Sequence, residues 1–156
     1  MLIHHLLVIY ITTISGAKSI QKIQKDAEIA VRQGVTQLIL SDKELSNSKL
    51  PMPMLLCVGA INSILIEKKL RGYVSINVQS GEAMDTHSFA TLIGVGATTI
   101  NPYLAFDSLY QRHEKKLFGQ FSFDDCVERY IKSVNAGASP SKKFASIAFL
   151  KFSIRQ

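Results

Sequence analysis

Cysteine is scarce in this chain, and no motif that uses it chemically is present. Cys57 and Cys126 lie far apart, with no CxxC pair and no Cys/His pair. A disulfide framework and a zinc site are therefore both unsupported, and a reduced, cytoplasmic setting is expected. Cys57 falls in an apolar helical stretch, where a cysteine serves packing unless its pKa is lowered.

Other common signatures of catalysis and binding are missing as well. The chain has no phosphate loop, no G-x-S-x-G and no metal-spaced cluster. Gly94 and Gly96 are spaced as in a dinucleotide-binding loop, but they precede a predicted strand instead of following one, and no third glycine stands at Thr99. We therefore expect a tight helix-to-strand turn there. Adjacent His4 and His5 would need partners from elsewhere to bind a metal, and they are expected to belong to a strand or an irregular terminus.

Long apolar runs and clustered charge are also lacking. The opening MLIHHLLVIYITTIS is shorter than the roughly 20 residues that span a bilayer, and it has no basic residue before the apolar run. The formal charge is +6, but residues 137–156 contribute four basic side chains and no acid: Lys142, Lys143, Lys151 and Arg155. We therefore expect neither a membrane nor a nucleic-acid partner.

What the chain does contain is an alternation of helical and strand patterns. Helices are predicted over residues 17–34, from Pro53 to about Leu70, from residue 86, from Pro102 and over 121–137, with strands at 38–40, 73–79 and 97–101. Gly34 and Gly72 are predicted to end the first two helices. The stretch MLLCVGAINSILI is apolar almost all round, which predicts a buried helix.

Two helix starts have recognisable caps. Asp85 or Thr86 is suited to cap the helix that follows it. Ser122 with Asp125 three residues later resembles a capping box, with Asp in place of the usual Glu or Gln.

This element order predicts an α/β fold. Strands separated by helices imply right-handed crossovers and a parallel sheet. At 156 residues the chain is too short for a whole eight-stranded barrel of about 250 residues. We therefore predict a parallel β/α layer resembling part of a TIM-type barrel, with three main strands and flanking helices.

Polar residues follow the predicted strands, where function gathers in parallel layers. The strand-end candidates are Asp42, Glu82 and Asn101. Of these, the two carboxylates are the groups capable of acid–base work, but they are favoured as caps or acceptors for loop amides. We expect no catalytic residue and no metal in this segment. His87 is expected to pack in the helix layer against a carboxylate, with a catalytic His–Glu pair as the alternative.

Five segments fall in an order that resembles the central domain of the large subunit of glutamate synthase. They are ILSD (39–42), MPMLLCVGAI (52–61), SGEA (80–83), HSFATLIGVGA (87–97) and INPYLAF (100–106). The resemblance covers residues 16–137, with residues 1–15 matching loosely and residues 138–156 forming an atypical basic tail that suggests a frame shift or truncation. The GEA sequence resembles the NADPH-type enzymes slightly more than the ferredoxin-type enzymes.

The resemblance implies a large enzyme of which this segment is a connecting scaffold. In that family an amidotransferase domain releases ammonia from glutamine, and the ammonia passes through an internal tunnel. A second domain, with FMN and an iron–sulfur cluster, aminates 2-oxoglutarate and reduces the product to glutamate with electrons from NADPH or ferredoxin. The implied partners are those two neighbouring domains and a possible small subunit, and the segment alone is expected to be inactive and to bind no cofactor.

The chain departs from the family pattern at several places. Asn62 and Ser63 stand where members commonly show paired histidines, Met84 and Asp85 where many have Arg and Glu, and Ser88 where many have a second His. These changes favour packing over a histidine-based role. Two alternatives remain open at this point: a free-standing half-barrel enzyme on a small phosphorylated or carboxylated metabolite, and a non-catalytic interaction module.

Overall fold

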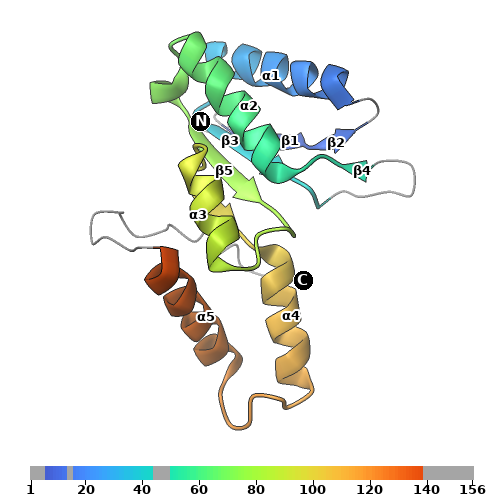
Figure 1. Cartoon of the computed structure of the whole chain (residues 1–156), viewed down its shortest axis with the longest axis vertical. Helices are drawn as coiled ribbons and strands as arrows, with labels where there is room; N and C mark the ends of the chain where they lie inside the picture. The colour runs from blue at the N-terminus through green and yellow to red at the C-terminus, as the bar shows by residue number, and fades with distance from the viewer. Residues whose placement is uncertain (1–5, 14–15, 44–49, 139–156) are drawn as a thin grey trace, which may run out of the picture.

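Four parallel strands form the main sheet, and they lie side by side in the order in which they occur along the chain (Figure 1). The structure is a computed structural model of the 156-residue chain and describes residues 6–13, 16–43 and 50–138. His4, His5 and the tail from residue 139 onward lie outside the described residues. The elements are β1 (Leu6–Tyr10), β2 (Thr12–Thr13), α1 (Gly16–Arg32), β3 (Gln37–Ser41), β4 (Leu50–Pro51), α2 (Met54–Glu67), a short 3-10 turn (Arg71–Tyr73), β5 (Ser75–Gln79), α3 (Thr86–Gly94), β6 (Thr99–Asn101), α4 (Tyr103–Glu114) and α5 (Phe123–Ala138).

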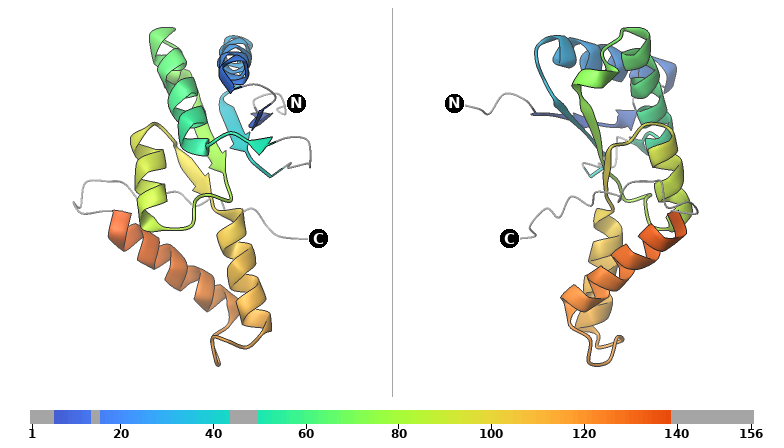
Figure 2. Two further views of the ribbon diagram at one scale, coloured as in Figure 1. Left: turned by 45° about the vertical axis from the view of Figure 1, so that its right-hand side comes forward. Right: turned by 90° about the vertical axis from the view of Figure 1, so that its left-hand side faces the viewer.

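One face of the sheet carries the core. Parallel strands joined in chain order by crossovers of one hand place every helix on the same side, and α1, α2 and α3 all cover this face (Figure 2). Strand residues in register with one another point into it, Leu38 beside Ile76 and Leu40 beside Val78 and Ile100, and all five are buried. The described sheet is open, so the layer corresponds to part of a barrel.

The opposite face of the sheet carries polar side chains that bond to one another. Asn77 donates from Nδ2 to Gln37 Oε1 at 2.7 Å, and Thr99 Oγ1 donates to Asn77 Oδ1 at 2.7 Å. One asparagine thereby links β3, β5 and β6. In a closed β/α barrel this face would line the interior.

The last two helices extend away from the sheet. Helix α5 packs on α3 and α4, and the α4–α5 pair projects below the sheet in Figure 1. Tyr130 of α5 stacks edge-on against Phe106 of α4, with ring centroids 6.0 Å apart, and its hydroxyl donates to the Met84 carbonyl at 3.1 Å. The pair is therefore fastened to the loop before α3.

The predicted α/β class and its parallel layer are confirmed, and so are several local signals. Gly34 has φ +92° just after α1. The Asp85 carboxylate accepts from Ser88 N at 2.8 Å. Ser122 and Asp125 accept each other's backbone N–H at 3.1 and 3.2 Å, which is the predicted capping box.

Other predictions need correction. The main sheet has four strands, not three, because residues 6–10 pair in parallel with β3. Gly72 does not end α2: the helix ends at Glu67, and Lys69 takes the left-handed conformation at φ 58°. Helix α2 is not buried on all sides, and Ile66 is 58% exposed.

Candidate functional site

The polar residues predicted at the strand ends do meet at the carboxyl edge of the sheet. Asp42 follows β3, residues 80–82 follow β5 and Asn101 ends β6. Ser80 joins the three, because its hydroxyl donates to Asp42 Oδ2 at 2.6 Å and its N–H donates to the Asn101 carbonyl at 3.1 Å. Asp42, Ser80 and Asn101 are all buried.

Asp42 is the centre of this cluster. Besides the Ser80 hydroxyl, its carboxylate accepts the Gly81 N–H, with both oxygens 3.1 Å from the nitrogen. Its own N–H donates to the Gln79 carbonyl at 3.2 Å. The side chain therefore fixes the loop that leaves β5 to the end of β3.

Tyr103, the first residue of α4, closes the cluster from the β6 side. Burial, the negative charge of Asp42 and a hydrogen bond to the Asp42 carboxylate raise the pKa of Tyr103 to about 12. A Cβ at Gly81 would lie 3.1 Å from the Tyr103 hydroxyl oxygen. The glycine of SGEA thus leaves room for this tyrosine, and Lys43 Nζ lies 5.7 Å from the centre of its ring.

Glu82 bonds to a different element. Its Oε2 accepts the N–H of Met54 at 3.1 Å, which is one of the orphan donors in the first turn of α2. A carboxylate at a helix N-terminus is also favoured by the helix dipole. Burial and the nearby charge of Glu82 raise the pKa of Cys57, one turn further on, to about 12, so the thiol stays protonated at neutral pH.

Asp42 and Glu82 therefore act on separate parts of the backbone, with Ser80 between them. The Ser80 hydroxyl accepts the Glu82 N–H at 3.1 Å while donating to Asp42. Together these bonds connect β3, the loop after β5 and the start of α2. The arrangement can hold three segments at a fixed separation, and it uses both carboxylates as acceptors for backbone groups.

A second polar cluster, at the opposite edge of the sheet, was not predicted. Arg71 donates from Nε to Asn62 Oδ1 at 2.8 Å, and its two terminal nitrogens donate to the carbonyls of Val74 and Gly96 at 2.7 and 2.8 Å. Gly96 makes the predicted tight turn, at φ +118°. The sequence offers one signal, because Asn62 is a polar side chain in the otherwise largely apolar sequence of α2.

The prediction for His87 is wrong, because its side chain is exposed on α3 and not packed in the helix layer. No ion pair joins it to Glu82 in the part of the chain that the structure describes. Within the same residues, no group of three or more His, Cys, Asp or Glu side chains is placed to hold a metal ion. Nor does any described helix have the length and apolar character to cross a membrane.

Comparison with known proteins gives a consistent family. The family model "Glutamate synthase central domain" matches residues 3–140. The NADPH glutamate synthase large chain of Azospirillum brasilense is 40% identical over 119 residues, covering 76% of this chain and 8% of that protein. Its counterpart in Bacillus subtilis (strain 168) is 47% identical over 111 residues, covering 71% and 7%.

Ferredoxin-dependent relatives match as well. The chloroplastic ferredoxin-dependent glutamate synthase of Spinacia oleracea is 43% identical over 96 residues, covering 60% of this chain and 6% of that protein. The chain thus spans less than a tenth of the length of the curated relatives it matches. Because the family model covers all of the described residues, the chain belongs to the glutamate synthase central domain family.

Proposed function

We propose that this chain is a segment of a glutamate synthase large subunit and serves there as a connecting scaffold. It lies between an amidotransferase domain, which releases ammonia from glutamine, and a domain that uses this ammonia to convert 2-oxoglutarate reductively into glutamate. The parent enzyme is a cytoplasmic oxidoreductase of ammonia assimilation, with NADPH or ferredoxin as electron source and a small subunit as a further partner. The family match and the small share of each relative that the chain spans support this proposal.

The observation that carries the scaffold role is what the two carboxylates do at the carboxyl edge. Asp42 accepts from Ser80 and Gly81, and Glu82 accepts from Met54 in the first turn of α2. A general acid or base must reach the proton of a substrate in a productive pose. Here both carboxylates are instead hydrogen-bonded to groups that determine where strands and helices begin and end.

The donor groups of this segment do not fit the flavin or the cluster of the parent enzyme. Iron–sulfur clusters are held by several cysteine thiolates, whereas this chain has two cysteines, Cys57 in α2 and Cys126 in α5. The phosphate of FMN suits free N–H groups at a helix N-terminus, but Glu82 and Asp85 already cap α2 and α3 with negative charge. We therefore assign FMN and the cluster to another domain of the parent chain.

The proposal is tested with Glu82→Ala and Glu82→Gln in the complete large subunit. A capping carboxylate predicts that Ala lowers the melting temperature and that Gln, which still offers an oxygen to Met54 N, restores part of the loss. Turnover per folded molecule then stays within about threefold of the original. A catalytic carboxylate predicts a loss of about 10²–10⁴ in turnover for both variants, with the melting temperature unchanged, and that result would overturn the scaffold role.

A further inference from the structure

Helix α2 has one face that nothing in the described chain covers. Leu55, Leu56 and Ile66 are 42%, 49% and 58% exposed on it, and a Cβ built at Gly59 meets no atom within 4 Å. We call this the α2 outer face; its residues are Leu55, Leu56, Gly59, Ser63 and Ile66. The opposite side of the helix carries Met54, Cys57, Val58, Ile61 and Leu65, all buried in the core.

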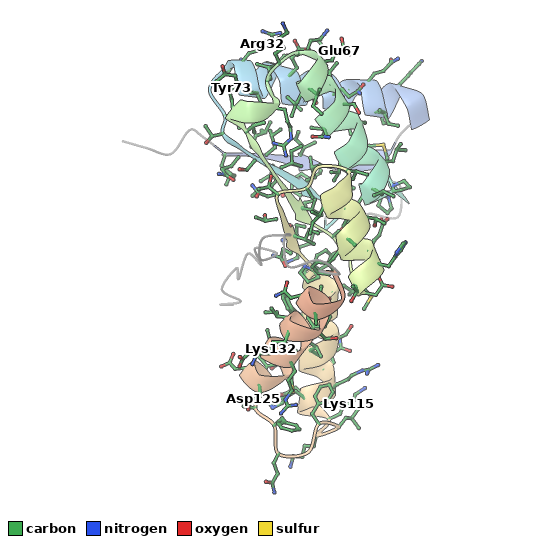
Figure 3. All side chains as sticks on the ribbon, turned by 60° about the vertical axis from the view of Figure 1, so that its left-hand side comes forward. Arg32, Glu67, Tyr73, Lys115, Asp125 and Lys132 are labelled. Atoms are coloured by element: carbon green, nitrogen blue, oxygen red, sulfur yellow. The ribbon has the colours of Figure 1, made fainter. Side chains whose placement is uncertain are left out.

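Charge separates this face from the other solvent-facing helices. From Met54 to Ile66 α2 has no charged residue, and α3 beside it has none either, with His87 as its one titratable side chain. The outward side of α1, by contrast, exposes Lys18, Lys22, Lys25 and Arg32, and α5 exposes Asp124, Asp125, Glu128, Arg129 and Lys132. In Figure 3 the labelled charged side chains accordingly lie at the two ends of the molecule, Arg32 and Glu67 at one end and Lys115, Asp125 and Lys132 at the other.

A surface helix normally has a polar side, and a helix that is apolar all round is buried in a larger protein. Helices α1 and α5 follow the first pattern and α2 follows the second. The α2 outer face is therefore built for contact with protein and not with water.

The spacing on this face indicates what kind of element fits it. Leu56, Gly59, Ser63 and Ile66 recur at intervals of three, four and three residues, which is the a/d stripe along which two helices pack. Large side chains lie at both ends of the stripe and small ones in the middle. A second helix can therefore approach closely over Gly59 and Ser63 and be held between the larger side chains.

The size of the face decides between a second copy of the chain and a tethered partner. Three aliphatic side chains at about half exposure offer on the order of 250 Å², well below the about 800 Å² per partner that a stable interface between separate chains buries. A segment of the same polypeptide needs much less contact area, because its tether keeps the local concentration high. More than nine-tenths of each curated relative lies outside the part that this chain matches, so such a segment has ample length to come from.

We propose that the α2 outer face is covered by an apolar helix from another part of the same large-subunit polypeptide, packed along the stripe from Leu56 to Ile66. This deepens the proposed scaffold function and rests on it. The α2 outer face is then one of the two contacts that a connecting domain must make, one with each neighbouring domain.

The test compares Ile66→Cys with a matched control, Ile29→Cys, in the complete large subunit. Ile29 is also an isoleucine close to the C-terminal end of a helix and is 44% exposed, but it lies on the charged side of α1. Maleimide labelling is followed peptide by peptide by mass spectrometry, before and after unfolding. We expect the introduced thiol at position 66 to react at least tenfold more slowly than the one at position 29 in the folded subunit, and equally fast in urea.

Equal labelling of the two thiols in the folded subunit would overturn the inference. Protection at position 66 that disappears on dilution would also overturn it, because the cover would then be a second copy. A second pair of variants, Ile66→Lys and Ile29→Lys, should lower the melting temperature of the complete subunit only at position 66. These readouts do not depend on turnover, so they can fail while the Glu82 variants still support the scaffold, or the reverse.

Discussion

Replacing Gly96 by alanine should destabilise the chain through two separable effects. The backbone of Gly96 has φ +118°, and the left-handed region costs an ordinary residue about 1–2 kcal/mol. In addition, a Cβ at this position would lie 2.4 Å from Cγ of Asn62, a distance that real structures do not tolerate. Asn62 must therefore move, and it then loses the hydrogen bond from Arg71 Nε at 2.8 Å.

The second effect is the larger one. Hydrogen bonds to a charged group contribute about 1.5–3 kcal/mol, so the two effects together predict a loss of about 3 kcal/mol or more. Gly34→Ala is the matched control, because Gly34 has φ +92° but its Cβ would meet no atom within 4 Å. Only the backbone cost, about 1–2 kcal/mol, applies there.

The assay is equilibrium unfolding in urea followed by far-ultraviolet circular dichroism, since the chain has no tryptophan to report by fluorescence. With a slope of about 2 kcal/mol per molar urea, the midpoint should fall by about 1.5 M for Gly96→Ala and by about half as much for Gly34→Ala. In an Asn62→Ala background the clash is gone, so Gly96→Ala should cost only its backbone term. Equal shifts for the two glycines, or strict additivity of Gly96→Ala with Asn62→Ala, would refute this reasoning.

Three further predictions concern titratable groups. Burial and the charge of Glu82 raise the pKa of Cys57 to about 12. The thiol should therefore react with a thiol reagent only as fast as the chain unfolds, and rapid labelling of the native chain would contradict its burial. The pKa of Tyr103 is about 12 in the folded chain against its ordinary value of 10.0, so the stability that this tyrosine contributes is complete below pH 10 and is lost as the pH rises towards 12. Tyr103→Phe should therefore flatten the alkaline part of a stability–pH curve. Hydrogen bonds from Ser122 lower the pKa of Asp125 below 3.8, so its contribution is present above pH 3.8 and disappears on further acidification. Asp125→Asn should remove that acid dependence, and an unchanged acid limb would show that the cap does not form.

Features that depend on neighbours in sequence were predictable. The Asp85 cap, the pairing of Ser122 with Asp125 and the turn at Gly34 each involve residues no more than four positions apart, so the residue types alone indicate the geometry. The strand ends were predictable too, because carboxyl ends of parallel strands share one edge. Asp42 and the residues after β5 therefore met where expected.

Features that depend on distant residues were not. Arg71 contacts Asn62, Val74 and Gly96, and nothing in the local sequence indicates that one arginine will serve two loops and a helix. The hydrogen bond between Tyr103 and Asp42 likewise joins residues that have β4, β5 and β6 between them in the chain. The bonds of Arg71 and Tyr103 follow from how α2, the strand ends and the start of α4 come together in space, which only the three-dimensional arrangement supplies.

Helix α2 shows how a correct pattern can give a wrong prediction. Its apolar sequence indicates burial on all sides, and the described chain buries only the side that faces the sheet. On the proposal made above, the pattern reflects the environment of the helix in a longer polypeptide. Sequence alone does not show which of the surfaces that cover a helix belong to the same segment of the chain.

The strands lie in the sheet in the same order as in the chain, and this order has a consequence for folding. No strand of β1, β3, β5 and β6 has to be inserted between two that are already paired, and each new strand can join an existing edge as soon as its helix has been made. Paired positions lie 31, 38 and 22 residues apart in the chain, so each new strand needs only the strand that precedes it in the sheet. During synthesis from the N-terminus, the β/α units would therefore leave the ribosome in the order in which they dock. Each completed unit then serves as a template for the next.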